Sequence, residues 1–110
     1  MTLDEVRELI LAFPEAYEDK AYRHGVIFRV RRKFFTRPVE SDKSLLVTQV
    51  PFEERELLAE LDPDTYRLDK HRMVLLVSIE RVAPASLKRL LGFCWREAAT
   101  KRAQRAYDPG

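Results

Sequence analysis

The sequence predicts a single α+β domain with a mostly antiparallel sheet and helices packed on it. Apolar residues recur at helical spacing near both ends of the chain, and segments typical of strands lie between them. The chain has 110 residues, the size of one domain, so residues 1–110 are expected to fold as one unit. A domain of this size buries about two-thirds of the surface that its unfolded chain exposes, so no disulfide or metal is needed to stabilise it.

The first helix is expected to begin after Thr2, because Thr2 and Glu5 fit a capping box. Pro14 ends the helix, since the residue before a proline avoids the helical region. The apolar residues between these two points recur at helical spacing, at Leu3, Val6, Leu9, Ile10 and Phe13.

The next segments predict strands. Residues 19–38 alternate apolar and charged side chains, with a tight turn near residues 31–33. Residues 44–50, SLLVTQV, form a further strand, and the polar PVESDK between the two predicts a second hairpin connection.

The second half of the chain predicts a helix, a strand and a long helix. Pro51 suits the first helical position, and the acids that follow it suit the helix dipole. After the DPDT turn at residues 62–65, the apolar run at residues 73–79 is typical of a central strand. The last helix starts at Pro84 and keeps helical spacing to about Ala106. The predicted order is therefore helix, three strands, helix, strand, helix.

The composition excludes several classes of protein. The single cysteine excludes an intrachain disulfide, and no apolar stretch approaches the 18 residues of a membrane span. The N-terminal segment is acidic and amphipathic, unlike a signal peptide. We therefore expect a soluble, reduced, cytoplasmic protein that has no membrane partner.

Charge is distributed in blocks, although the net charge is only +2. Residues 1–19 hold six acids and one base, and residues 20–37 hold seven bases and no acid. Residues 53–64 again hold six acids against one base, and bases outnumber acids ten to four from residue 65 onward. Such blocks predict a molecule with one acidic and one basic face.

The segment FRVRRKFFTR at residues 28–37 contains five cations and three phenylalanines. Side chains alternate between the two faces of a strand, so the length of the turn decides which residues face the core. With two or four loop residues, the core face carries Val26, Phe28, Val30 and Phe35. The outer face then carries Arg29, Arg31, Phe34 and Thr36, with Arg32 and Lys33 at the tip, whereas three loop residues reverse the assignment of the second strand.

The turn itself has an unusual composition. Tight hairpin turns need positive φ and therefore favour Gly, Asn or Asp, none of which occurs in the RRK of residues 31–33. Either the loop is longer than two residues, or arginines are held in the turn at some energetic cost.

This segment has two interpretations. In a nucleic-acid-binding protein the arginines would contact phosphates and the aromatic ring would stack on a base or an arginine. In the alternative, Arg and Phe form an ordinary cross-strand pair on a face exposed to water. His71 beside Lys70 and Arg72 extends the basic surface. Lys101, Arg102 and Arg105 supply either further phosphate contacts or cations that suit a helix C-terminus.

The residues that could support catalysis or bind a metal are scattered. His24, His71 and Cys94 have no recognised zinc spacing, so we expect neither a metal nor a cofactor. Cys94 lies on the apolar stripe of the last helix and predicts a buried, inert thiol, with Trp95 in the core or at its edge. The carboxylates of Glu53, Glu56 and Glu60 are expected to be solvated, and no glycine-rich phosphate loop exists. No catalytic residue is predicted, and we expect a protein that is not an enzyme.

The chain contains, in this order, the pieces LAFPEAYED, VIFRVRRKFFTR, LLVTQVPFEERELL, DKHRMVLLVSI and APASLKRLLGFCWREAATKR. Through these pieces, from about Leu9 to Arg102, it resembles the MmcQ/YjbR-like family of small bacterial proteins. Within them, the matching positions are Phe13-Pro14, Lys33 and Phe35, Lys70-His71, and Trp95 with Lys101.

The resemblance implies an α+β fold of the kind compared with a double-wing nucleic-acid-binding arrangement, and the function of a predicted DNA-binding protein. It implies no cofactor and no catalytic residue. The chain departs from the family at the hairpin tip, where Arg31-Arg32 stands in place of glycines. It departs again after the Lys70-His71 pair, where Arg72 and Met73 stand in place of the usual tryptophan.

The sequence thus predicts a DNA-binding protein that contacts phosphates through a basic β-hairpin at residues 26–37. The alternative is a non-enzymatic protein-interaction or adaptor domain, in which the acidic helix at residues 51–61 docks on the basic face of another copy. A third hypothesis is an enzyme that binds an anionic small molecule through Arg29 or His71. The candidate nucleic-acid contacts are Arg29, Arg31, Arg32, Lys33, Phe34, Arg37, His71, Arg72, Lys101 and Arg102. All of them require that the hairpin cations are not neutralised by glutamates of the acidic helices.

Overall fold

The N-terminal capping box forms in the computed structural model, which describes residues 1–21, 25–39 and 43–107. The Thr2 hydroxyl accepts the backbone N–H of Glu5 at 3.2 Å, and the Glu5 carboxylate accepts the backbone N–H of Thr2 at 2.9 Å. Helix α1 (Leu3–Leu11) follows and buries Val6 and Ile10, as the spacing predicts. His24 lies outside the described residues.

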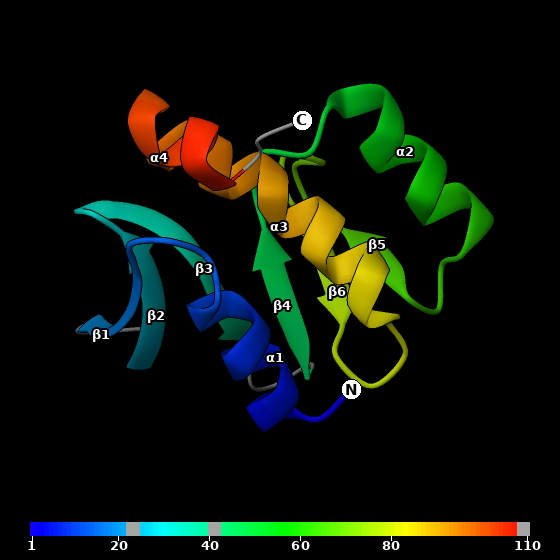
Figure 1. The fold of residues 1–110 in the computed structure, drawn as a ribbon. Helices are drawn as coiled ribbons and strands as arrows, with labels where there is room; N and C mark the ends of the chain where they lie inside the picture. The colour runs from blue at the N-terminus through cyan, green and yellow to red at the C-terminus, as the bar shows by residue number, and fades with distance from the viewer. Residues whose placement is uncertain (22–24, 40–42, 108–110) are drawn as a thin grey trace.

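The strands form one antiparallel sheet in the order β1-β2-β3-β4-β6-β5 (Figure 1). Residues 16–39 supply three of them, where the predicted order has two, and the first begins three residues earlier than the alternation predicts. A short strand after the DPDT turn was not predicted, because three residues are too few to show periodicity. The strands are β1 (Ala16–Ala21), β2 (Gly25–Val30), β3 (Lys33–Val39), β4 (Ser44–Val47), β5 (Tyr66–Leu68) and β6 (Leu75–Ser78).

The predicted last helix is divided into α3 (Pro84–Ala98) and α4 (Lys101–Tyr107). Ala99 is extended, with ψ at 156°, which ends α3, and the Thr100 hydroxyl accepts the backbone N–H of Ala103 at 3.1 Å. Thr100 therefore caps a new helix, because a threonine hydroxyl satisfies an N–H at a helix start. The prediction of one continuous helix to about Ala106 is wrong at this point.

Helices α1 and α3 lie over one face of the sheet, and α2 (Phe52–Leu61) lies beside β5 at its edge (Figure 1). Trp95 of α3 is completely buried, and its Nε1–H donates to the Pro14 carbonyl at 2.9 Å. Cys94 is also buried, with its Sγ 3.8 Å from the Thr48 hydroxyl oxygen. Both residues are in the core, as predicted.

The β2–β3 hairpin contains a bulge that changes which residues face the core. Val30 pairs with Lys33 and Arg29 with Phe34, but Phe28 pairs with Thr36, so Phe35 is the extra residue. Because partners across a strand pair share a face, the bulge turns Thr36 toward the core. Thr36 is 0% exposed and its hydroxyl donates to the Leu46 carbonyl at 2.7 Å, so placing Thr36 on the outer face was wrong. Of the predicted core residues of this hairpin, Phe28, Val30 and Phe35 are buried, and Val26 is half-buried against the core.

The described residues contain no helix long and apolar enough to cross a bilayer. They also contain no group of three or more side chains that could hold a metal ion.

Candidate nucleic-acid interface

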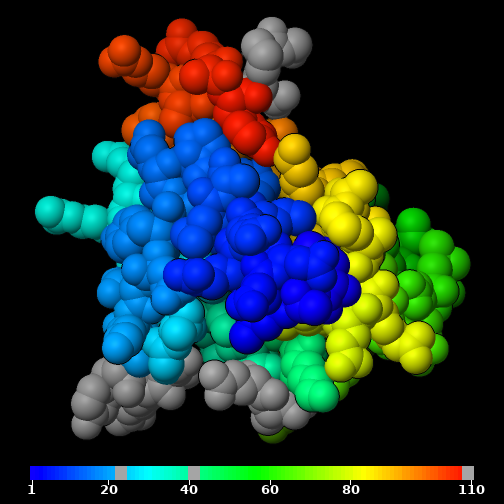
Figure 2. All heavy atoms as spheres, turned by 60° about the horizontal axis from the view of Figure 1, so that its bottom comes forward, coloured from blue at the N-terminus to red at the C-terminus, as the bar shows by residue number. Residues whose placement is uncertain are grey.

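The β2–β3 turn presents three consecutive cations to solvent. Arg31 and Arg32 are the two residues of the turn, and Lys33 begins β3. All three are exposed, and none forms an ion pair with any residue in the described ranges. Figure 2 shows a side chain of this cyan segment projecting from the body of the molecule.

Arg31 adopts φ of 60°, the left-handed region that a tight hairpin turn requires. The loop is therefore short, and an arginine occupies a position that usually favours glycine. A residue with a Cβ atom in this conformation costs about 1 kcal/mol relative to glycine. The turn thus holds its cation despite a local conformational cost.

Arg29, in contrast, forms an ion pair with a residue of β1. Its Nε donates to Asp19 Oδ2 at 2.8 Å, and its Nη1 donates to the Arg32 carbonyl at 3.2 Å. The N–H of Lys20 and then the Arg29 guanidinium hold the pKa of Asp19 below its ordinary value. Arg29 is therefore a half-exposed cation with a fixed position, and its charge is partly neutralised.

Arg37 reaches the outer face of the sheet because of the bulge. It pairs with Leu46, whose neighbours Leu45 and Val47 are buried in the core on the opposite face. Without the extra residue, strand alternation would point Arg37 into the core. The side chain is half-exposed and forms no ion pair within the part of the chain that the structure describes.

Among the described residues, no acid of α1 or α2 forms an ion pair with a cation of the basic hairpin. In α2, Glu54 pairs with Arg89 of α3, and Glu56 pairs with Arg72. In β1, Glu18 accepts from Arg7 of α1 at 2.5 Å. The condition for a polyanion site therefore holds for the turn cations, whereas Arg72 is paired with an acidic helix.

The strand order brings a second basic segment to the same end of the sheet. Because neighbouring strands are antiparallel, the β2–β3 turn and the β5–β6 turn both lie at the end where β4 finishes. His71 and Arg72 are exposed in the β5–β6 turn. Hydrogen bonds and the charge of Glu56 raise the pKa of Arg72, so this cation is permanent but already paired.

Helix α4 also lies at this end. The Phe13 ring contacts Phe35 of β3 at 5.4 Å between ring centroids and Tyr107 of α4 at 5.5 Å. In Figures 1 and 2 the cyan turn and the orange to red α4 occupy the same side of the molecule. Lys101 and Arg102, in the first turn of α4, are exposed, as is Arg105. Three basic segments far apart in sequence thus share one end of the sheet.

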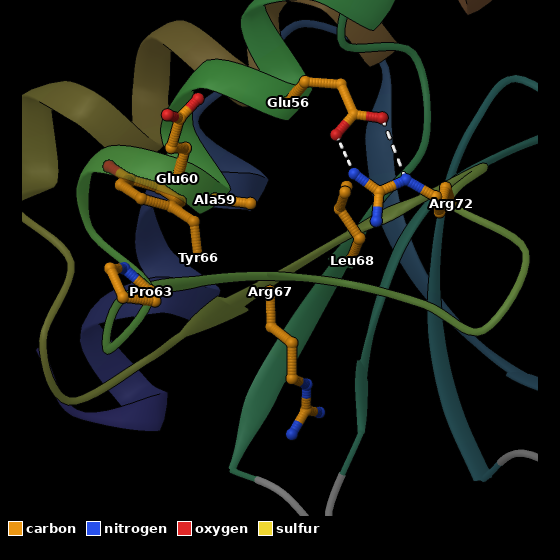
Figure 3. Close-up of a pocket in the computed structure, with 8 residues that line it drawn as sticks. All are labelled: Glu56, Ala59, Glu60, Pro63, Tyr66, Arg67, Leu68 and Arg72. Carbon is orange, nitrogen blue, oxygen red and sulfur yellow. Dashed lines mark hydrogen bonds and ion pairs between the residues drawn. The ribbon is translucent and has the colours of Figure 1, made fainter.

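A pocket of about 490 Å³ lies between α2 and β5, and Figure 3 shows its lining. The Arg72 guanidinium meets the Glu56 carboxylate, whereas Arg67 points away from both. Arg29 and His71 do not line this pocket. These are the two residues through which the enzyme hypothesis expects an anionic small molecule to bind. The polar groups of the pocket do not converge on a shared point where a substrate would react.

Comparison with family models matches residues 11–97 to the YjbR family. The chain belongs to the YjbR family. The comparisons with curated proteins and with solved structures give no match. The matched range includes the hairpin and the β5–β6 turn, and α4 with Lys101 and Arg102 follows it.

Within this YjbR chain, sequence reasoning missed one residue of the surface around the hairpin. Tyr17 of β1 pairs with Arg29 and is 40% exposed. The alternation of Tyr17 with Asp19 was a usable signal, since both lie on one face of β1. The predicted strand segment begins at residue 19 and therefore does not include Tyr17, whereas β1 begins at Ala16.

Proposed function

We propose that this member of the YjbR family binds DNA, without sequence preference, through phosphate contacts at the basic end of its sheet. Arg31, Arg32 and Lys33 are the principal contacts, with Arg37, Lys101 and Arg102 extending the surface. Contacts to phosphates position a protein on DNA but carry no sequence information. The proposal assigns the protein no catalytic residue and no cofactor.

The observation that carries the proposal is the exposure of three adjacent cations that form no ion pair with the described residues, in a turn that is strained at Arg31. A cation that is already paired must lose its partner before it can bind a phosphate, so Arg31, Arg32 and Lys33 can bind at a lower cost than Arg29 or Arg72. We therefore assign Arg29 the role of positioning the DNA strand, and we assign Arg72 a secondary phosphate contact. His71 and Phe34 border the same surface, Phe34 on β3 and His71 in the β5–β6 turn.

The proposal is tested by gel retardation of a labelled DNA duplex with the wild type and with Arg31→Ala/Arg32→Ala. Each phosphate neutralised lowers the slope of log affinity against log salt by about 0.9. We expect the wild type to bind at low salt and to weaken steeply between about 50 and 200 mM salt. The variant should bind about tenfold more weakly at low salt, with a slope that is shallower by about 2.

A matched control removes two cations elsewhere. Arg81→Ala/Lys88→Ala takes the same charge from exposed positions, one in the β6–α3 connection and one on α3. Neither position forms an ion pair with the described residues. If this control weakens binding as much as the turn variant, net charge alone controls affinity. Absence of wild-type binding at low salt contradicts the proposal.

One observation favours the alternative, a protein-interaction domain. Leu57 and Leu61 lie one helical turn apart on α2 and are 52% and 71% exposed. An apolar strip beside acidic side chains could dock on the basic end of a second copy. Sedimentation at low and high ionic strength tests this function, since salt-sensitive self-association is expected from it and a monomer at both ionic strengths would contradict it.

A further inference from the structure

Three side chains form a row across the outer face of β1, β2 and β3. Tyr17 pairs with Arg29, and Arg29 pairs with Phe34, so the three residues are in register on adjacent strands. Residues paired across antiparallel strands lie on the same face of the sheet. The order across the sheet is therefore aromatic, guanidinium, aromatic.

All three side chains are accessible to solvent. Tyr17 is 40% exposed and Phe34 is 36% exposed, and the Arg29 side chain is 30% exposed. The core residues of the same strands, Phe28, Val30 and Phe35, are buried on the opposite face. The rings of the row therefore do not belong to the hydrophobic core.

The row adjoins the unpaired cations of the turn. Tyr17 also lines a hollow of about 500 Å³ together with Arg31, Arg32 and Lys33. Phe34 follows Lys33 directly in β3. The exposed rings are thus within reach of a ligand whose negative charges are held by the turn.

Arg29 keeps the row ordered. Its ion pair with Asp19 of β1 and its hydrogen bond to the Arg32 carbonyl in the turn fix the guanidinium, and β2, which carries Arg29, lies between the strands that carry the two rings. Adjacent strands are about 4.8 Å apart, so the backbones that carry Tyr17 and Phe34 are about 10 Å apart. Two rings at this separation can contact two different bases of one strand.

A flat ring exposed beside unpaired cations fits a ligand that offers phosphates and bases together. Base stacking on an aromatic side chain is tolerant of sequence, because every base has a π face. In a duplex the base faces are stacked inside the helix, whereas a single strand offers them freely. Charge complementarity therefore favours DNA on this surface, and the exposed rings favour its single-stranded form.

We propose that the row of Tyr17, Arg29 and Phe34 is a stacking platform that binds the bases of single-stranded DNA while the turn cations hold its phosphates. This inference rests on the proposed function and names the form of DNA that the site prefers. The rings contact bases, and Arg29 positions the strand between them.

The test compares three labelled probes by fluorescence anisotropy: a strand of about 15 thymidines, an abasic strand of the same length, and a duplex. The abasic strand carries the same phosphates without bases, so it measures the charge contribution alone. We expect the wild type to bind the thymidine strand about tenfold more tightly than the abasic strand. Tyr17→Ala/Phe34→Ala should bring the thymidine strand close to the affinity of the abasic one.

Two further variants separate stacking from structure. Phe34→Tyr keeps a ring and should retain affinity for the thymidine strand, whereas Phe34→Leu keeps apolar bulk without a ring and should lose it. Phe52→Ala is the control, since it removes an exposed ring on α2 that does not belong to the row. Thermal denaturation by circular dichroism checks that each variant folds.

The outcomes distinguish this inference from the proposed function. Equal wild-type affinity for the thymidine and abasic strands, with no effect of Tyr17→Ala/Phe34→Ala, overturns the stacking platform and leaves phosphate binding intact. Tighter binding of the duplex than of the thymidine strand also overturns the platform. No binding to the abasic strand or to the duplex at low salt contradicts the proposed function itself.

Discussion

At the scale of single residues, the backbone conformation of Arg31 favours a different residue from the one that supplies a charge. Its φ of 60° favours glycine, and yet an arginine places a cation there. We predict that Arg31→Gly raises the free energy of unfolding by about 0.5–1 kcal/mol, because it removes the left-handed strain and offsets part of that gain through backbone entropy. Thermal denaturation should show a midpoint higher by about 4 °C. The same variant should bind the DNA duplex more weakly, which gel retardation measures.

Arg32→Gly is the matched control for this prediction, since Arg32 is not in the left-handed region. It removes the same charge, but it should lower stability by about 0.5 kcal/mol, because glycine gains freedom only in the unfolded chain. An equal change of stability in both glycine variants would show that Arg31 carries no strain.

Single residues also show where sequence reasoning succeeds. The capping box of Thr2 and Glu5 and the burial of Trp95 depend on helical spacing, which the sequence displays directly. The position of Thr36 depends on the bulge and on a hydrogen bond to Leu46 in the next strand. Pairing between strands joins residues that are distant in the sequence, so the alternation within one strand does not predict it. The same bulge moves Arg37 to the outer face.

At the scale of elements, the β5–β6 turn is held by one carboxylate. Asp69 Oδ1 accepts from the N–H of Met73 at 2.7 Å and of Val74 at 2.8 Å, and Oδ2 accepts from the N–H of His71 at 3.2 Å. The N–H of Val74, followed by those of His71 and Met73, lowers the pKa of Asp69 below its ordinary value. The ionised carboxylate therefore stabilises the folded turn.

This arrangement predicts a dependence of stability on pH. A group whose pKa is lower in the folded state stabilises the protein above its unfolded pKa of about 3.9. That stability is lost as the pH falls through the lower folded value. Asp69→Ala should therefore lower the thermal midpoint at pH 7, and the difference from wild type should shrink as the pH falls below about 4.

Thermal denaturation at several pH values measures this difference. Asp64→Ala is the control, since Asp64 is exposed in the DPDT turn and its carboxylate accepts no hydrogen bond from the described residues. A difference between wild type and Asp69→Ala that stays constant down to pH of about 2 would contradict the role of the carboxylate.

Elements also show the limits of periodicity. The strand predicted at residues 73–79 corresponds to β6, whereas the strand predicted at residues 44–50 ends at Val47, and β5 has only three residues. The break between α3 and α4 follows from the extended Ala99 and the Thr100 cap, and the apolar stripe continues across it. A stripe that continues predicts one helix even where the backbone makes two.

At the scale of the whole molecule, the sheet order brings together basic segments that the sequence separates. The β2–β3 turn and the β5–β6 turn lie at one end of the sheet because β4 and β6 pair next to each other, although α2 and β5 separate them in the chain, and α4 lies at the same end (Figure 1). The sequence showed the blocks of charge, but only the topology shows that three basic segments from two of these blocks converge. The acidic block of α2 is engaged with Arg72 and Arg89, which leaves the hairpin uncovered.

This convergence predicts that the turn and α4 contribute independently to one DNA-binding surface. Arg31→Ala/Arg32→Ala and Lys101→Ala/Arg102→Ala should each make the negative slope of log affinity against log salt shallower by about 1.8, and the quadruple variant by about 3.6. The contributions should add, because the two pairs share no ion-pair partner among the described residues. Gel retardation of the duplex at several salt concentrations measures the three slopes. A slope that changes for the turn pair and not for the α4 pair would confine the contact to the hairpin, since DNA that lies along the whole end of the sheet must reach both.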